Sequence, residues 1–123
     1  MAEIKSHRDL LVWQKAMDLA VAVYRLSQKF PANEIYRLVA QVTRSASSVP
    51  ANIAEGHGRV TRRDYANFVA IARGSLMETE TLVMLSVRLG YTERGEAQPV
   101  LNLITEISKM LTVLRSRLSE PPL

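Results

Sequence analysis

Hydrophobic residues recur three and four positions apart through most of this 123-residue chain, the spacing that places side chains on one face of an α-helix. The pattern predicts four long helices, at about residues 9–29, 33–58, 62–89 and 96–118. The short connections between them favour an all-α, up-down-up-down antiparallel four-helix bundle. We expect this bundle to be a single domain over residues 1–123, with loose tails at 1–8 and 119–123.

Each predicted helix has apolar rows that define its expected buried face. The first helix has two rows, Leu10, Trp13, Met17, Ala20 and Tyr24, and Val12, Ala16, Leu19, Val23 and Leu26. The row of the second helix is Ile35, Leu38, Val42, Ala46, Val49 and Ile53. The rows of the third and fourth helices are Tyr65, Val69, Ala72, Leu76, Thr79 and Val83, and Val100, Ile104, Ile107, Leu111, Leu114 and Leu118.

The second helix also has a row of polar residues, called the polar seam below. Its members are Gln41, Ser45, Ser48, Asn52, Glu55 and Arg59. Two interpretations are open, because such a row either faces water or packs against protein. Solvated rows usually have long Lys and Glu side chains, whereas this row is built around Ser and Asn, which are poor helix formers. We therefore expect the polar seam to pack against a neighbouring helix or subunit.

Proline and glycine predict local features of the second and third helices. Pro50 cannot donate a hydrogen bond to the carbonyl of Ala46, so we expect a kink in the second helix. Gly56 and Gly58 are expected to end that helix. Gly74 and Ser75, in the middle of the third helix, predict the close approach of another helix, with the kink at Pro50 and Ala51 as the expected partner.

Composition narrows the class of protein. The absence of cysteine excludes disulfides, thiol catalysis and zinc–thiolate sites. The opening residues lack the apolar core of a signal peptide, and no uncharged run reaches the ~20 apolar residues of a membrane span. We therefore expect a cytoplasmic protein without a membrane partner. Sixteen Lys and Arg against twelve Asp and Glu give a net charge of +4, a weak indication of anionic partners.

None of the usual catalytic arrangements can be assembled from the sequence. The two histidines, His7 and His57, are the first candidates for a general acid or base. Neither belongs to a Glu-x-x-His pair of the kind that holds metals in helical bundles, and no glycine-rich loop opens a helix. We predict a protein that is not an enzyme and has no metal or other cofactor.

Charged residues near the junction of the second and third helices predict two further features. Glu55 and Arg59 lie one helical turn apart and are expected to form an ion pair. A basic patch is expected from six arginines, Arg37, Arg44, Arg59, Arg62, Arg63 and Arg73. Two interpretations of this patch are open, since it either binds nucleic acid or is a solvated or interface-lining set of arginines.

Two segments carry a family resemblance, SSVPANIAEGHGR at 47–59 and FVAIARGSLMETETLVMLSVRLGY at 68–91. Together with DLLVWQKAMDLAVAVYRL and FPANEIYRLVAQVTRSA nearer the start, they resemble a family of four-helix bundles. This family comprises the proteins encoded in intervening sequences of bacterial 23S ribosomal RNA genes, also described as S23 ribosomal protein-like. The likeness covers about residues 9–118.

The resemblance implies a closed homo-oligomer, a ring of five bundles, but brings no established activity. A related pentameric group accompanies the reverse transcriptases of diversity-generating retroelements and binds protein and nucleic acid, an analogy of fold alone. The leading interpretation is therefore a non-catalytic, oligomer-forming bundle that serves as an assembly or adaptor module. The alternative is a protein, associated with 23S rRNA or a retroelement, that binds RNA or another nucleic acid through the basic patch. RNA or a nucleic-acid-processing protein is then the expected partner.

Overall fold

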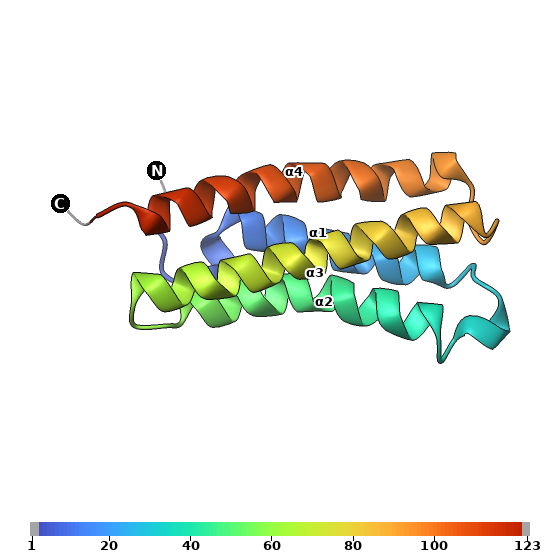
Figure 1. The fold of residues 1–123 in the computed structure, drawn as a ribbon, viewed down its shortest axis with the longest axis horizontal. Helices are drawn as coiled ribbons and strands as arrows, with labels where there is room; N and C mark the ends of the chain where they lie inside the picture. The colour runs from blue at the N-terminus through green and yellow to red at the C-terminus, as the bar shows by residue number, and fades with distance from the viewer. Residues whose placement is uncertain (1–2, 122–123) are drawn as a thin grey trace.

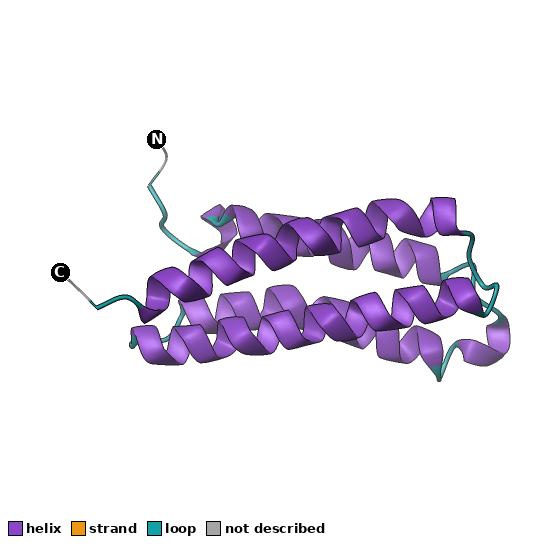
Figure 2. Cartoon of the chain, turned by 45° about the horizontal axis from the view of Figure 1, so that its top comes forward, coloured by secondary structure: helices purple, strands orange, loops and turns teal. Residues whose placement is uncertain are grey.

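The computed structural model describes residues 3–121 as four antiparallel helices lying side by side (Figure 1). Two short 3₁₀ helices precede α1 and α2, and loops make up the rest of the described chain (Figure 2). The elements are η1 His7–Asp9, α1 Leu11–Ser27, η2 Ala32–Glu34, α2 Leu38–His57, α3 Arg62–Arg88 and α4 Arg94–Ser119. The predicted all-α four-helix bundle is confirmed. No helix within residues 3–121 is long and apolar enough to cross a bilayer.

The helices form a closed square in which each lies beside its neighbours in the chain and α4 lies beside α1. The pair α2 and α3 is in the most extensive contact. Interior positions of the predicted rows meet along the bundle axis, and the largest fully buried side chains include Leu19, Ile53, Leu76, Ile104, Ile107 and Leu111. The connections are short and the core is continuous, so the fold is set by four apolar faces turned toward one axis.

The predicted start of the second helix was wrong. The chain first forms η2, and Arg37 then takes φ −120° and ψ −102°, which interrupts helical geometry before α2 begins at Leu38. Ile35 consequently lies outside α2 and is 56% exposed instead of buried. Met17 and Tyr24, expected in the core, are also exposed, because the bundle covers only part of the wide apolar face of α1.

The beginning of the chain is more ordered than the predicted loose tail. Ser6 and Asp9 form a capping box around η1, in which the Asp9 carboxylate accepts hydrogen bonds from the backbone N–H groups of Lys5 and Ser6. These bonds favour the charged carboxylate and lower the pKa of Asp9. At the other end, α4 continues to Ser119. Residues 1–2 and 122–123, also predicted as tail, lie outside the described residues.

Glycine and proline do not all act as expected. α2 continues through the buried Pro50 as one helix, and the kink there stays a prediction. Gly56 lies inside α2, and a Cβ added to it would be 2.8 Å from the Cβ of Phe68 on α3. A Cβ added to Gly74 would meet nothing within 4 Å. The prediction of a close approach was therefore wrong for Gly74 itself, whereas Ser75 beside it does meet α2, with its Oγ atom 2.9 Å from that of Ser48. The approach that leaves no room for a Cβ occurs at Gly56.

Replacing Gly56 by alanine tests this approach. In an open helix the substitution stabilises by ~0.5–1 kcal/mol, because glycine is entropically costly there. At Gly56 the new methyl group would force α2 and α3 apart. We therefore expect Gly56→Ala to lower the free energy of unfolding by about 1–3 kcal/mol in urea titrations.

Gly74→Ala is the matched control, since the same methyl group enters open space in α3. We expect it to raise the free energy of unfolding by ~0.5–1 kcal/mol. Similar effects of the two substitutions would show that α2 and α3 are not closely packed at Gly56.

Candidate functional site

The inner part of the polar seam lies between α2 and α3 of the same chain. Ser45 is fully buried, and its hydroxyl donates to the carbonyl of Val42 at 3.1 Å. The Oγ1 atom of Thr79, also fully buried, lies 2.9 Å from the Oγ atom of Ser45. The same Thr79 atom lies 2.8 Å from the carbonyl oxygen of Ser75. Two buried hydroxyls thus join the helices where the core would otherwise be apolar.

The network continues one turn toward the end of α2. The Oγ atoms of Ser48 and Ser75 lie 2.9 Å apart across the two helices. The Nδ2 group of Asn52 donates to the carbonyl of Ser48 at 2.8 Å and to its hydroxyl at 2.9 Å. These three side chains are half-buried, so the network reaches the surface between α2 and α3.

The partners of the seam on α3 were not predicted from the sequence. Thr79 was assigned to an apolar row. Ser75 was placed beside that row and, together with Gly74, at the expected close approach to the Pro50 kink, without a named partner. The available signal was their spacing of four residues, which puts two hydroxyls on one face of α3 opposite Ser45 and Ser48.

The outer members of the polar seam, Gln41, Glu55 and Arg59, are exposed. The predicted ion pair is confirmed, with the Nη2 atom of Arg59 2.7 Å from the Oε1 atom of Glu55. The Arg59 guanidinium also lies 4.7 Å from the ring centroid of Phe68. A half-exposed ion pair of this kind contributes only about 0.3–0.5 kcal/mol to the stability of the fold, so it is a minor surface interaction.

The six arginines of the predicted basic patch do not come together at one place. Arg37 lies just before α2 and Arg59 just after it, about 30 Å apart along a helix of this length. Arg37 and Arg44 pair with Glu34 and Glu78, at 3.6 and 2.8 Å. With Arg59, half of the set is already neutralised by carboxylates.

The other three arginines of the set, Arg62, Arg63 and Arg73, form no ion pair within residues 3–121. All three lie on the first half of α3. Arg62 donates to the carbonyl oxygen of Arg117 on α4, so its side chain is directed toward α4 and away from the junction of α2 and α3.

Both histidines contact aromatic rings. His7 lies edge-on to Trp13 with ring centroids 5.0 Å apart, and His57 lies edge-on to Tyr65 at 5.8 Å. Burial of the Tyr65 side chain raises the pKa of its hydroxyl. Over the described part of the chain, no three His, Asp or Glu side chains are grouped so that they could hold a metal ion.

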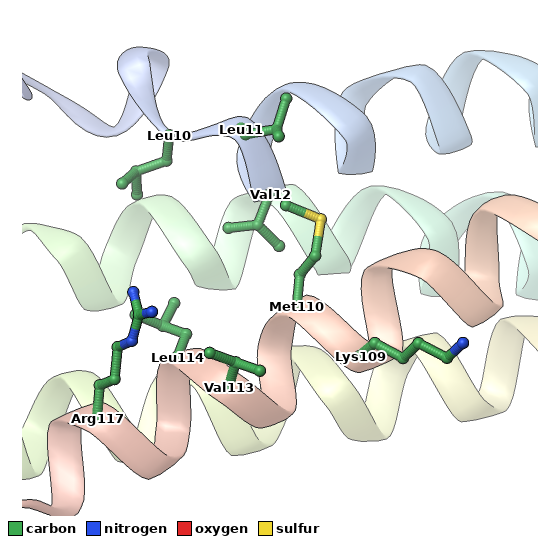
Figure 3. A pocket seen from close by; sticks show the side chains of 8 residues that line it. All are labelled: Leu10, Leu11, Val12, Lys109, Met110, Val113, Leu114 and Arg117. Atoms are coloured by element: carbon green, nitrogen blue, oxygen red, sulfur yellow. The ribbon is translucent and has the colours of Figure 1, made fainter. Parts of the chain in front are cut away.

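A groove between the start of α1 and the end of α4 is largely apolar. Figure 3 shows Leu10 and Val12 directed toward Met110 and Leu114, whereas the Lys109 ammonium points away from them. Leu10, Met110 and Leu114 also pack against the buried core. The groove is therefore a place where the core reaches the surface, and its lining is mainly hydrophobic, with Lys109 and Arg117 as its charged members.

The hydroxyl pair between α2 and α3 can be tested by Thr79→Val, which keeps the shape and removes the oxygen atom. We expect the free energy of unfolding to fall by about 0.5–1.5 kcal/mol, because the interhelical hydrogen bond is lost. Thr81→Val is the control, since exposed Thr81 makes the same bond to the carbonyl four residues earlier but has no partner on α2. Its effect should stay within about 0.5 kcal/mol. In the double variant Ser45→Ala/Thr79→Val, a loss of unfolding free energy equal to the sum of the two single losses would contradict a direct hydrogen bond between these side chains.

The chain matches the model of the family described as 23S rRNA-intervening sequence protein over residues 8–113. A crystal structure from Bacteroides thetaiotaomicron, described as a protein with unknown function from the S23 ribosomal protein family, superposes with a TM-score of 0.76. It is 30% identical to this chain, and the match covers 85% of this chain and 98% of the other. Among curated proteins, no significant match was found. The chain belongs to the family of 23S rRNA-intervening sequence proteins.

Proposed function

We propose that this protein is a non-catalytic helical bundle that associates with copies of itself and serves as an assembly or adaptor module. The observation that supports this proposal is an uncharged face formed by α1 and α2, called the α1–α2 face below. It consists of Trp13, Met17, Val21, Tyr24, Val39, Thr43, Ser47 and Ala54.

On α1, this face has exposed apolar side chains in a row. Met17, Val21 and Tyr24 follow one another at steps of four and three, and they are 41%, 46% and 50% exposed. Exposed apolar residues scattered singly need no explanation, but a contiguous strip marks an interaction surface. The first candidate for its partner is a surface of the same kind of chain.

The α2 part of the face favours the approach of another helix. Thr43, Ser47 and Ala54 have short side chains, and Tyr24, Val39 and Thr43 line one groove between the two helices. A side chain from a second copy can enter this groove without displacing a charged group. The resemblance to ring-forming bundles supports a closed homo-oligomer, for which five copies is our proposal.

The polar seam is less suitable for this role. Ser45, Ser48 and Asn52 already have partners within the chain, so their hydrogen-bonding groups are not left for a second copy. The basic patch drawn from the sequence is also weakened as a nucleic-acid site, because Arg37, Arg44 and Arg59 are paired with carboxylates. Location in the cytoplasm stays a prediction.

Self-association can be tested by sedimentation velocity at micromolar protein concentration. We expect the wild type to sediment as an assembly of several copies. Met17→Glu should shift the protein to monomers or smaller species, because a carboxylate placed in an apolar interface has to give up its hydration and has no charged residue one turn away on α1.

Ile71→Glu is the matched control, since Ile71 is 50% exposed on α3, outside the α1–α2 face, and has no charged residue one turn away. It should sediment as the wild type does. A wild-type monomer would overturn the proposal, and equal dissociation of the two variants would move the interface away from the α1–α2 face.

A further inference from the structure

Another groove lies between the first half of α3 and the end of α4, on the side of the bundle opposite the α1–α2 face. It is lined by Arg73 of α3 and by Thr112, Arg115, Ser116 and Ser119 of α4. Its volume is about 500 Å³, and all five lining residues are exposed, so it is an open surface groove and not an enclosed pocket. Every side chain in the lining is either a guanidinium or a hydroxyl, so the groove is cationic and rich in hydrogen-bonding groups.

The two arginines of this groove are not neutralised by the protein. Within residues 3–121, neither Arg73 nor Arg115 forms an ion pair. The carboxylate on the same side of α3 is that of Glu80, seven residues or about 10 Å along the helix from Arg73. The arginines at the α2–α3 contact differ, since Arg44 and Arg59 each have a carboxylate within 3 Å.

The hydroxyls leave one donor for a ligand. Thr112 and Ser119 donate to the carbonyls of Ser108 and Arg115, at 2.9 and 3.0 Å. The hydroxyl of Ser116, between them, has no acceptor among the described residues. Two guanidiniums, which can each donate two parallel hydrogen bonds, and a free hydroxyl are suited to the tetrahedral oxygens of a phosphate group.

A structural role for these arginines explains only part of the arrangement. Basic residues near the end of a helix stabilise its last carbonyls, and Arg62 does this by donating to the carbonyl of Arg117. Arg73 lies eleven residues further along α3, about 16 Å from Arg62, which is too far for it to cap α4. Arg73 instead lines the groove together with Arg115.

We propose that the groove between α3 and α4 is a binding site for a phosphate group, held between Arg73 and Arg115 with Ser116 as an additional donor. The ligand is a small phosphate compound or one phosphate of a polynucleotide backbone, since both present the same oxygens. This inference does not depend on self-association, because no residue of the groove belongs to the α1–α2 face.

The site can be tested with two probes, sodium pyrophosphate in calorimetric titrations and a fluorescein-labelled uridine octamer in fluorescence anisotropy. We expect the wild type to bind at least one of them, and Arg73→Ala and Arg115→Ala each to weaken that binding at least tenfold. Ser116→Ala should weaken it a fewfold. Pyrophosphate binding without octamer binding would assign the site to small phosphate compounds, and the reverse would assign it to a polynucleotide backbone.

Arg88→Ala is the matched control, since Arg88 is an exposed arginine at the far end of α3 and the net charge changes equally. Its affinity should stay within twofold of the wild type. Failure of both probes to bind, or an equal loss in Arg88→Ala, would overturn the proposal. Thermal melts of each variant establish that it is folded. If Arg115→Ala is unfolded, Arg73→Ala alone decides, because Arg73 is exposed in the middle of its helix.

Discussion

The close contact between α2 and α3 depends on small side chains where the two helices face each other. Gly56 has no room for a methyl group beside Phe68, and Ser45, Ser48 and Ser75 have side chains short enough for their hydroxyls to meet across the interface. Larger residues would separate the helices and leave the hydroxyls of Ser45 and Thr79 without their contact in a buried environment, where unpaired polar groups are costly. α1 and α4 then pack against this pair and complete the hydrophobic core.

This pairing divides the surface of the bundle into two unlike sides. The α1–α2 face is uncharged and has exposed apolar side chains, whereas the α3–α4 groove is lined by arginines and hydroxyls. Because α1 and α2 lie opposite α3 and α4 in the square, a copy that covers the first side leaves the second accessible. Such an arrangement suits a module that associates with its own copies through the α1–α2 face and binds a phosphate group in the α3–α4 groove.

The sequence predicted the architecture well because helical periodicity reports directly on burial. The inner apolar rows were correct, and so was the ion pair of Glu55 and Arg59, since both depend on spacing within one helix. The predicted burial of Ile35 was wrong because it depended on where α2 begins, which is decided by the backbone of Arg37. The predicted close approach at Gly74 was wrong because a glycine in a helix does not reveal whether another helix lies opposite it.

The candidate sites were harder to predict because they depend on contacts between helices. The six arginines were grouped by sequence, yet the helix between Arg37 and Arg59 keeps these two apart. Arg115 could not be connected with Arg73 before the register of α4 against α3 was known. The partners of Ser45 and Ser48 were visible as the hydroxyl residues Ser75 and Thr79, but only the register shows that these pairs meet.

The separation of charge between the two sides has a consequence for the influence of ionic strength. Counterions screen the guanidiniums of the α3–α4 groove over roughly 10 Å at 0.1 M salt, so contacts made there weaken as salt rises. Apolar contacts on the α1–α2 face contain no charge to screen, and salts such as sulfate that are excluded from protein surfaces strengthen them. One and the same change of medium therefore acts in opposite directions on the two sides of a single small bundle.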